Sequence, residues 1–300
     1  MNNIRLLPPL RLVLNTSCNG NCYFCHHEGY DSQNVDMPWD VINECIEAAC
    51  ELNVTRISLT GGEPTLRKDL SDIIFAIKNR LPSIELGITT NGFALCNLPT
   101  ATLDLLDNIN LSMVSFEDAI CKKYQGVDIE KLFVFLKDFA NKTTINIVVV
   151  DENKDELIPI VKKCFAYDFN VDLMFELYSN DVPLQKKILS DLTNEFGLFS
   201  IHYGSTPIMM QCEKNHKRLR VKAPSISNIL QRNVCKNCLQ YNQCPEKICA
   251  LRIHPNGCVS PCLNGHLQSN QNTVAARIKE IYPKLDIGTD SLYDYFFKRK

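Results

Sequence analysis

Six short runs rich in Val, Ile and Leu alternate with longer helical segments through the first two thirds of this 300-residue chain. Such runs are typical of strands that are buried on both faces of a parallel sheet. A strand–helix repeat of roughly 25 to 40 residues indicates parallel βαβ units. The sequence therefore predicts an α/β fold, a partial (βα)6 TIM-like barrel, with strands at Leu10–Asn15, Thr55–Thr60, Glu85–Thr90, Asn110–Ser115, Thr144–Val150 and Val171–Leu177. We expect Asp36 to cap the helix predicted over Pro38–Leu52.

The strand–helix repeat ends near residue 195, and the composition of the chain changes there. From Phe196 onward Gly, Pro, Asn and Lys are frequent, and six cysteines occur between Cys235 and Cys262. A segment of this kind is organised around a metal centre more readily than around a large apolar core. We therefore expect two domains: the partial barrel over residues 1–195 and a cysteine-rich iron–sulfur module over residues 196–300.

Cysteine is unusually frequent, with 15 residues in the chain. A chain of this length buries enough surface to fold without disulfides, and its N-terminus lacks the pattern of a secretory signal. No apolar run approaches the roughly 18 residues that a membrane helix needs. We expect a cytoplasmic protein with reduced thiols, in which clustered cysteines bind a metal or a cluster. The net charge of −2 offers no basic excess for a nucleic-acid polymer.

The strongest chemical signal is the sequence Cys18-x3-Cys22-x2-Cys25, directly after the first predicted strand. Three thiolates from one short loop can hold three irons of a [4Fe–4S] cluster and leave the fourth iron open to another ligand. Zinc is the alternative, although a structural zinc site normally takes four protein ligands. The spacing favours the iron–sulfur cluster.

A second motif, Gly61-Gly62-Glu63-Pro64, follows the second predicted strand. The glycines allow a close approach of the backbone to a ligand, and Glu63 can accept hydrogen bonds from an ammonium group. Both motifs lie at the carboxyl ends of neighbouring strands, the edge where barrel enzymes carry their active sites. Thr90 and Ser112 lie at the same edge, after or near the ends of the third and fourth strands.

Together the cysteine loop and the Gly-Gly-Glu-Pro turn resemble the radical S-adenosylmethionine (SAM) superfamily over residues 10–195. The resemblance implies that Cys18, Cys22 and Cys25 hold a [4Fe–4S] cluster that binds SAM. It also implies an electron donor such as flavodoxin or ferredoxin, and reductive cleavage of SAM to a 5′-deoxyadenosyl radical that takes hydrogen from a substrate. The implied contacts to SAM are Gly61, Gly62, Glu63, Thr90 and Ser112.

Within that superfamily the chain is most similar to the GTP 3′,8-cyclase family of molybdenum cofactor biosynthesis. The likeness rests on Leu10-Arg11-Leu12 before the cysteine loop, Cys25-His26-His27-Glu28-Gly29 after it, and the segment from Cys249 to Cys262. It implies a second [4Fe–4S] cluster that binds the substrate. The implied substrate contacts are Arg11, Arg67 and Arg252, and Arg11 is also an implied catalytic residue.

The chain departs from the cyclase family at three cationic positions, where it has Thr144, Leu173 and Ala250. A charge-assisted hydrogen bond typically contributes ~1.5–3 kcal/mol, so these departures predict weaker binding of a triphosphate. A basic run lies further on, and we expect it to be solvated surface, with attraction of a phosphate or an acidic leader peptide as the alternative. The basic run consists of Lys214, Lys217, Arg218, Arg220 and Lys222.

The second cysteine group supplies six thiols where the cyclase family uses three. Four ligands would close a cluster and make it an electron relay, three would leave an open iron, and zinc is the alternative metal. We expect Cys249 and Cys262 to be ligands, together with at least one of Cys235, Cys238 and Cys244.

The sequence thus predicts a radical SAM enzyme acting on a small, nucleotide-like substrate, with GTP 3′,8-cyclisation as the nearest named reaction. One alternative is a peptide maturase with a closed auxiliary cluster, and another is a non-catalytic iron–sulfur or zinc-binding protein. The expected partners are a small-molecule or peptide substrate and an electron donor, without a nucleic-acid polymer or a membrane.

Overall fold

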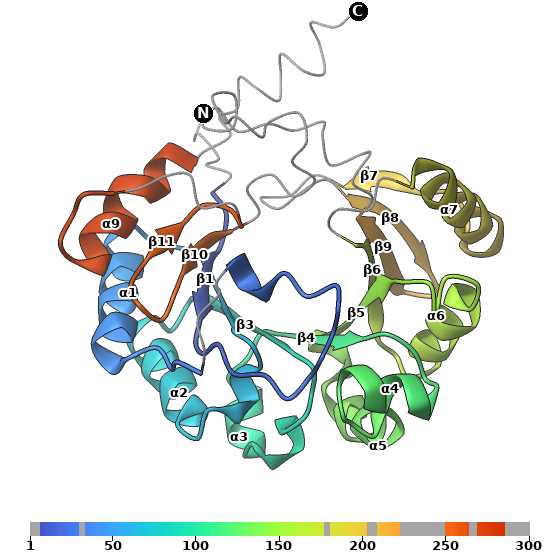
Figure 1. The fold of residues 1–300 in the computed structure, drawn as a ribbon, viewed down its shortest axis with the longest axis horizontal. Coiled ribbons are helices and arrows are strands. Elements are labelled where there is room, and N and C mark those ends of the chain that lie inside the picture. Colours follow the sequence, from blue (N-terminus) through green and yellow to red (C-terminus); the bar gives the residue numbers. More distant parts are fainter. Residues whose placement is uncertain are drawn as a thin grey trace, which may run out of the picture.

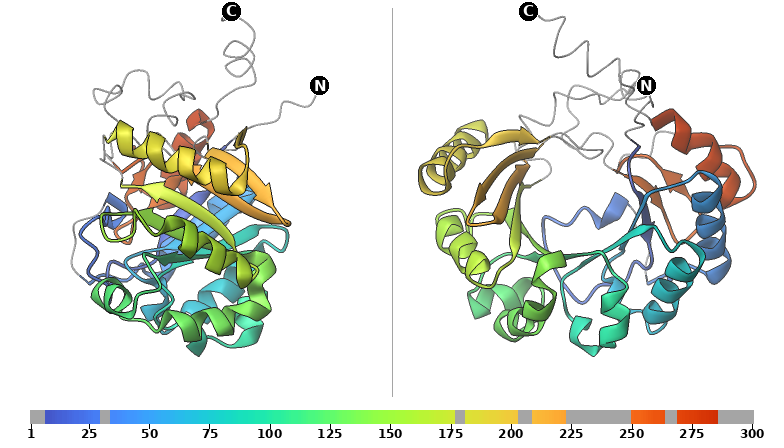
Figure 2. Two further views of the ribbon diagram at one scale, coloured as in Figure 1. Left: turned by 90° about the vertical axis from the view of Figure 1, so that its right-hand side faces the viewer. Right: turned by 180° about the vertical axis from the view of Figure 1, so that it is seen from behind.

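In the computed structural model, the described strands form a curved sheet of eleven, with helices along its outer side (Figure 1). The structure describes residues 7–29, 34–176, 181–202, 209–222, 250–263 and 269–285. The view from behind in Figure 2 shows the same arrangement, with the helices outside the curve. The strand order is β11-β10-β1-β2-β3-β4-β5-β6-β9-β8-β7, so that the two edge strands β11 and β7 do not pair with each other.

The six predicted strands are all present, and they pair in parallel and in chain order. This confirms the predicted α/β class and the partial barrel. The fourth strand begins two residues earlier than predicted, because its pairing with the third strand starts at Asn108, opposite Gly87. The strands are β1 (Leu10–Val13), β2 (Arg56–Thr60), β3 (Glu85–Thr90), β4 (Asn108–Met113), β5 (Thr143–Val149) and β6 (Asn170–Phe175).

Helices connect these strands and bury their apolar faces against the outer side of the sheet (Figure 1). In α1 (Trp39–Glu51), for example, Val41, Ile42, Cys45 and Ile46 recur at helical spacing and are buried. The helices that follow are α2 (Leu70–Arg80), α3 (Thr100–Asp104), α4 (Asp118–Tyr124), α5 (Ile129–Leu136), α6 (Leu157–Ala166) and α7 (Val182–Phe196). Short 3-10 turns include η1 (His27–Gly29), η2 (Pro64–Leu66), η3 (Leu95–Asn97), η4 (Lys137–Lys142) and η6 (Tyr282–Leu285).

The start of α1 differs from the sequence-based expectation that Asp36 caps it. Pro38 precedes the helix, and no side chain caps it. Asp36 instead pairs with Asn15 in an isolated bridge at the end of β1. The bridge between Asp36 and Asn15 therefore holds the segment before α1 against the end of β1.

Strands after residue 195 extend both edges of the same sheet. On one edge, β9 (Lys217–Lys222) lies parallel to β6 and is followed by antiparallel β8 (Met209–Lys214) and β7 (Ser200–His202). On the other edge, β10 (Leu251–Ile253) lies parallel to β1 and pairs with β11 (Val259–Ser260). The division at residue 195 stays a prediction, but the described strands on both sides of it share one sheet.

The last described helix, α9 (Val274–Ile281), joins the C-terminal segment to the start of the chain. Lys279 forms an ion pair with Glu51 of α1 at 2.6 Å. The Tyr282 hydroxyl, buried after α9, donates a hydrogen bond to the Pro8 carbonyl oxygen at 2.9 Å. Both ends of the described chain are thereby tied to the β1 side of the barrel.

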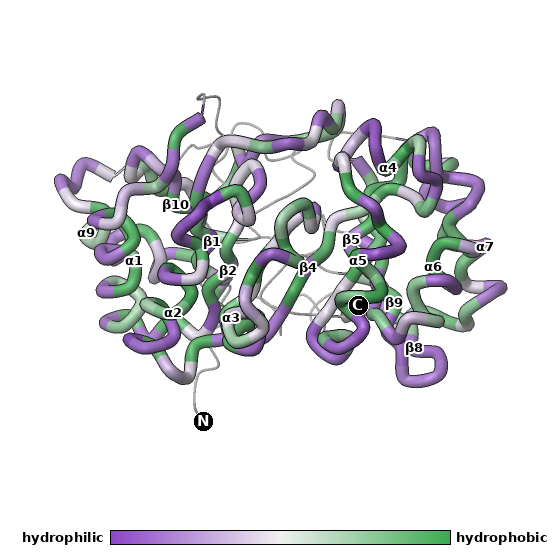
Figure 3. Tube along the Cα trace, turned by 90° about the horizontal axis from the view of Figure 1, so that it is seen from below, coloured by the Kyte–Doolittle hydropathy of each residue, from purple (hydrophilic) through white to green (hydrophobic). Residues whose placement is uncertain are grey.

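The two faces of the sheet have different chemistry. Residues such as Leu12, Leu59 and Ile109 are fully buried against the helices, and Figure 3 shows hydrophobic colour along the strands and hydrophilic colour at many of the turns. Register partners in neighbouring strands point to the same side of a sheet. One such series of inner-face positions runs through Arg11, Ser58, Gly87, Asn108, Ser112, Asn146, Asp172 and Arg220.

None of the described helices is both long enough and apolar enough to cross a membrane.

Candidate active site

The cysteine loop follows β1 and is held against the end of α4. The backbone N–H of Asn21 donates to the Tyr124 carbonyl oxygen at 3.1 Å, and the Asn19 side chain donates to the Gln125 carbonyl oxygen at 2.7 Å. A Cβ at Gly20 would lie only 2.6 Å from the Tyr124 carbonyl oxygen. Gly20 is therefore required by this close backbone approach, which fixes the path of the loop between Cys18 and Cys22.

Within the loop, backbone N–H groups are directed at two of the three sulfurs. Gly20 donates to Cys18 Sγ at 3.3 Å, and His27 donates to Cys25 Sγ at 3.4 Å. Burial raises the pKa of both thiols, and these N–H groups act against that rise. Burial and the neighbouring Cys25 and Cys18 raise the pKa of Cys22 to about 11. Three thiolates this close to one another need a cationic partner.

The cysteine loop, with N–H groups directed at two of its sulfurs, suits a [4Fe–4S] cluster. None of the three cysteines takes part in a disulfide. Within the described ranges, no three His, Cys, Asp or Glu side chains converge on a position where they could hold one ion. A cluster instead takes one thiolate on each of several irons and gains stability from N–H groups directed at the sulfurs.

The glycines after β2 bring their turn against the chain that leads into the cysteine loop. Gly62 N–H donates to the Asn15 carbonyl oxygen, and Glu63 N–H to the Ser17 carbonyl oxygen, both at 2.8 Å. A Cβ at Gly61 would lie 2.2 Å from Asn15 Oδ1, and one at Gly62 would lie 2.3 Å from the Ser17 oxygen. The close approach that the glycines permit in this structure is therefore to the polypeptide itself, and it positions the residue before Cys18.

The Glu63 carboxylate is buried and bound by residues of the same rim. Its Oε1 accepts hydrogen bonds from the Thr90 hydroxyl at 2.5 Å and the Thr65 hydroxyl at 2.7 Å, and its Oε2 accepts one from Asn91 N–H at 2.6 Å. Burial raises the pKa of Glu63, against these hydrogen bonds, which lower it. Thr90 thus joins the β3 end to the glycine turn through Glu63.

Ser112 lies on the inner face of β4, half-buried and in register with Asn146 of β5. Its carbonyl oxygen accepts a hydrogen bond from the Gln125 side chain, just beyond α4. The predicted SAM contacts therefore fall into two groups, with Gly61, Gly62, Glu63 and Thr90 in one hydrogen-bonded cluster and Ser112 further along the sheet. Their roles toward SAM stay predictions.

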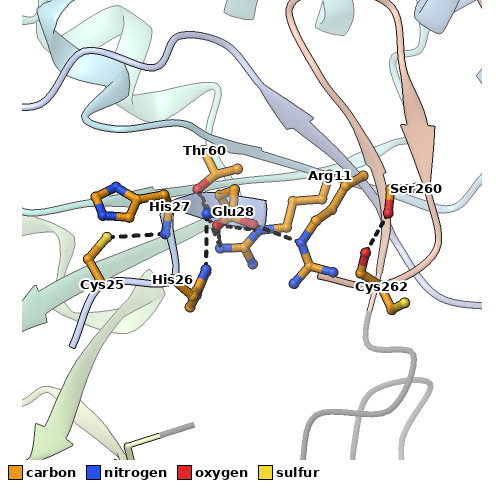
Figure 4. Close-up of polar contacts among 9 residues, drawn as sticks. Arg11, Cys25, His26, His27, Glu28, Thr60, Ser260 and Cys262 are labelled. Atoms are coloured by element: carbon orange, nitrogen blue, oxygen red, sulfur yellow. Dashed lines mark hydrogen bonds and ion pairs between the residues drawn. The ribbon is translucent and has the colours of Figure 1, made fainter. Parts of the chain in front are cut away.

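A buried carboxylate, Glu28, joins two of the three arginines that were predicted to contact substrate. Glu28 Oε1 accepts from Arg11 Nη2 at 2.6 Å, and Oε2 accepts from Arg252 Nε at 2.9 Å. The Thr60 hydroxyl also donates to Glu28, at 3.0 Å. In Figure 4 the Glu28–Arg11 pair lies between Cys25 and Cys262. The network thus connects the cysteine loop with β1, β2 and β10.

The electrostatics of Glu28 follow from its two cationic partners. Burial opposes ionisation of Glu28, but the charges of Arg11 and Arg252 outweigh it and hold its pKa below the usual range. The chain reaches this position through two successive left-handed residues, since φ is 47° at His27 and 53° at Glu28. This backbone conformation is unfavourable for residues other than glycine. The ion pairs of Glu28 with Arg11 and Arg252 offset the conformational energy that it costs.

Arg67, the third predicted substrate contact, is held by hydrogen bonds within the protein, and its role toward substrate stays a prediction. Its Nη1 donates to the carbonyl oxygens of Leu14 at 2.9 Å and Met37 at 2.6 Å, while Nε and Nη2 donate to Asp69. All three guanidinium nitrogens are thereby engaged, and the side chain is only 4% exposed. Arg67 joins β1, the segment before α1 and the start of α2, which is a structural role.

Four of the predicted auxiliary ligands, Cys235, Cys238, Cys244 and Cys249, lie outside the described residues. Cys262 is described and half-buried, just after β11, and its carbonyl oxygen accepts a hydrogen bond from the Ser260 hydroxyl. The predicted second cluster stays a prediction.

Sequence reasoning missed the contribution of Glu28 and of Asn91. Asn91 donates from its side chain to Asn19 Oδ1 at 3.0 Å and from its backbone to Glu63, so it links the cysteine loop to the glycine turn. Glu28 stands inside the quoted segment after the cysteine loop and Asn91 directly follows Thr90, but their partners lie on other elements. Only the expectation that neighbouring strand ends meet could have indicated them.

A partial barrel with a three-cysteine loop after β1, locked against a Gly-Gly-Glu turn after β2, defines an iron–sulfur enzyme of the barrel class. The chain belongs to the radical SAM superfamily, whose sequence profile matches residues 12–164. Membership implies a [4Fe–4S] cluster, SAM and a source of electrons.

Curated relatives share part of the chain. A protein of Thermoplasma volcanium named "Probable GTP 3′,8-cyclase" is 35% identical over 163 residues, which cover 51% of this chain and 49% of that protein. A protein of Sulfolobus acidocaldarius with the same name is 29% identical over 234 residues, which cover 74% of this chain and 72% of that protein. The match to the first of these relatives thus spans about half of its length.

Solved structures share the fold at low sequence identity. Streptococcus suis SuiB, in a complex with the precursor peptide SuiA, matches with a TM-score of 0.64 and 17% identity over 94% of this chain and 65% of that chain. The protein anSMEcpe, solved with bound AdoMet and the Cp18Cys peptide, matches with a TM-score of 0.60 and 15% identity. The match covers 92% of this chain and 80% of that chain. These likenesses extend the common fold beyond the barrel.

Proposed function

We propose that this radical SAM enzyme abstracts hydrogen from a small, nucleotide-like substrate bound inside the partial barrel, with GTP 3′,8-cyclisation as the nearest named reaction. The observation that carries the proposal is the Arg11–Glu28–Arg252 network. It provides two guanidinium groups for one buried carboxylate, beside the cysteine loop. Guanidinium groups beside the cysteine loop suit an anionic substrate, and the relatives named GTP 3′,8-cyclase support a nucleotide.

In this proposal Cys18, Cys22 and Cys25 hold the SAM-binding cluster, which when bound and reduced supplies the electron that cleaves SAM to a 5′-deoxyadenosyl radical. The protein positions the reactants and excludes water. Gly61, Gly62 and Glu63 set the position of the loop and receive the amino group of SAM. Phe24 packs on Tyr124, with ring centroids 5.7 Å apart, and covers one side of the loop.

On the substrate side, Arg11 presents a side chain that is 24% exposed, whereas Arg252 is almost fully buried. We assign direct contact with the substrate to Arg11 and a supporting contact to Arg252. Glu28 orients both guanidinium groups. The auxiliary cluster, with Cys262, Cys249 and at least one of Cys235, Cys238 and Cys244 as ligands, completes the proposed substrate site.

The test is release of 5′-deoxyadenosine by the anaerobically reconstituted, reduced protein, with and without GTP. We expect SAM cleavage that GTP stimulates, and none in Cys22→Ala, which removes one cluster ligand. Cleavage that survives Cys22→Ala would overturn the assignment of the cluster. Cleavage in the wild type that ignores GTP would keep the radical chemistry and reject GTP as the substrate.

Peptide maturation is the second candidate, because the likeness to SuiB, solved with its precursor peptide, covers nearly the whole chain. It predicts that a short peptide, and not GTP, stimulates 5′-deoxyadenosine release. If the intact, reconstituted protein cleaves no SAM under any of these conditions, a non-catalytic iron–sulfur or zinc-binding protein becomes the better description.

A further inference from the structure

The basic run on β9 lies partly on the inner face of the sheet. Lys217 forms an ion pair with Asp168 at 2.9 Å on the helix side, after α6. Side chains along a strand point alternately to its two faces. The other three basic residues of β9 therefore point to the inner face, opposite to Lys217; they are Arg218, Arg220 and Lys222. Arg220 is opposite Asp172 in the register series that begins at Arg11. The expectation that the whole run is solvated surface is therefore wrong for the arginines, which are half-buried on the inner side.

The two inner-face arginines differ in how their charges are balanced. Arg220 donates to both carboxylate oxygens of Asp172, with Nε 2.7 Å from Oδ1. Arg218 crosses the inner face of β6 to reach the Thr144 hydroxyl of β5 at 3.5 Å. Among the described residues no carboxylate forms an ion pair with Arg218, although exposed Glu213 is its register partner on β8. Arg218 is therefore a half-buried cation without an ion-pair partner among the described residues, although the charges of Asp172, which is paired with Arg220, and of Glu213 act on it from further away.

Two buried polar atoms on this part of the sheet also lack hydrogen-bond partners in the described structure. They are Nε of Arg218 and Oδ1 of Asn146, which lies two residues beyond Thr144 on the inner face of β5. A buried polar atom without a partner is destabilising, so unsatisfied groups are rare and call for an explanation. A bound ligand that accepts from Arg218 and donates to Asn146 would satisfy both.

We propose that Arg218, with Asn146 and the paired Arg220, forms a subsite for the oxyanion group of a hydroxyl-bearing small molecule. The oxyanion, a phosphate or a carboxylate, accepts hydrogen bonds from the Arg218 guanidinium, and a hydroxyl of the same molecule donates to Asn146 Oδ1. Asp172 holds Arg220 in place, and Lys222, at the carboxyl end of β9, adds positive charge nearby. The subsite lies on the same inner face as Arg11, which faces the cysteine loop.

The ligand chemistry follows from the donor and acceptor inventory of these residues. A guanidinium has a planar set of N–H donors that matches the oxygens of phosphate and carboxylate. The inference rests on the proposed function only in taking the ligand to be the enzyme's substrate. The anion site itself is independent of SAM chemistry.

The experiment measures binding of inorganic pyrophosphate and of succinate to the anaerobically reconstituted protein by calorimetry. Pyrophosphate represents a phosphate ligand and succinate a carboxylate ligand, so the two titrations distinguish between them. We expect Arg218→Met to weaken binding of the preferred anion roughly tenfold or more, and Arg218→Lys to retain part of it. Lys217→Gln removes a charge from the same strand but from the opposite face, and it should change the affinity less than about threefold.

A thermal scan without added anion separates this role from a structural one. Met is close to Arg in length and carries no charge, so Arg218→Met should unfold at the wild-type temperature or above it. The preferred anion should raise the unfolding temperature of the wild type and not that of the variant. Equal affinities in wild type and Arg218→Met, or equal losses in Arg218→Met and Lys217→Gln, would overturn the subsite.

Release of 5′-deoxyadenosine, measured on the same wild-type preparation, keeps the two proposals apart. If SAM is cleaved but anion binding does not depend on Arg218, the subsite is rejected and the radical chemistry stands. If no SAM is cleaved and pyrophosphate binding depends on Arg218, the subsite stands and the proposed function fails.

Discussion

At the scale of single residues, the site depends on polar groups whose partners are far away in the sequence. Glu28 contacts Arg11 and Arg252, and the contact with Arg252 spans 224 positions. A charge buried in this way is strongly destabilising when one partner is removed, because the others are left uncompensated. Glu28 is therefore the residue at which a single change separates the cysteine loop from both arginines.

We predict that Glu28→Gln lowers the free energy of unfolding by about 3 kcal/mol at neutral pH. Since the folded-state pKa of Glu28 is depressed, its contribution is fully present above the unfolded-state value near 4.5 and is lost progressively as the pH falls below it. Urea denaturation should therefore show a difference in the free energy of unfolding between wild type and variant that is constant near neutral pH and becomes smaller in acid.

The matched control is Glu51→Gln, which removes a carboxylate from the exposed ion pair with Lys279. A surface pair contributes about 0–1 kcal/mol, so this variant should unfold almost like the wild type. A Glu28→Gln protein as stable as Glu51→Gln would contradict the importance of the network.

At the scale of elements, the cysteine loop is positioned by two neighbouring loops. The glycine turn after β2 contacts it through Asn15 and Ser17, and the end of α4 contacts it through the Tyr124 carbonyl oxygen. Only a residue without a Cβ permits these approaches. The Gly-Gly-Glu turn therefore matters for the geometry of the cysteine loop before SAM is considered.

We predict that Gly62→Ala reduces the iron bound per chain after anaerobic reconstitution. The new Cβ would lie 2.3 Å from the Ser17 oxygen, and relieving that overlap moves the backbone next to Cys18. Overpacking of this kind typically costs about 1–3 kcal/mol. Iron and sulfide analysis, together with the visible absorbance of the reconstituted protein, measures the effect.

Gly87→Ala on β3 serves as the control, since its Cβ would meet its nearest neighbours at the ordinary distance of 3.4 Å. That variant should bind as much iron as the wild type. Equal iron content in Gly62→Ala and Gly87→Ala would show that the turn does not position the cysteine loop.

At the scale of the whole molecule, the residues after 195 complete the sheet. β10 covers the β1 edge and β9 covers the β6 edge, and α9 packs against α1. Removing these elements would leave two parallel strand edges unpaired, which favours aggregation. The compositional boundary at residue 195 therefore need not be a boundary of independent folding.

We predict that a chain ending at Glu195 unfolds at a lower temperature than a chain ending at Leu285, which keeps every described element, and that it aggregates. Thermal unfolding and size-exclusion chromatography of the two proteins provide the measurement. Equal unfolding temperatures and a monomeric shorter chain would instead support residues 1–195 as a self-sufficient domain.

Much of the barrel was predictable because it depends on local pattern. The run from Glu85 to Thr90 forms β3 with the predicted ends, and buried residues in α1 follow the helical period. The Asp36 cap was mispredicted because a tertiary pairing with Asn15 uses that segment. The contacts of Arg67 were not predictable, because a motif match cannot show that the backbone carbonyls of Leu14 and Met37 accept hydrogen bonds from its guanidinium.

Local sequence patterns specify the strand–helix repeat, the cysteine spacing and the glycine turn, because each depends on neighbours along the chain. Three further features could be seen only in the folded chain: Glu28 lies between Arg11 and Arg252, β10 joins β1, and Arg218 points into the barrel. These features depend on strand register and on pairings across the whole chain. A shift of one residue in register reverses the face of every side chain in a strand, so no local pattern could specify them.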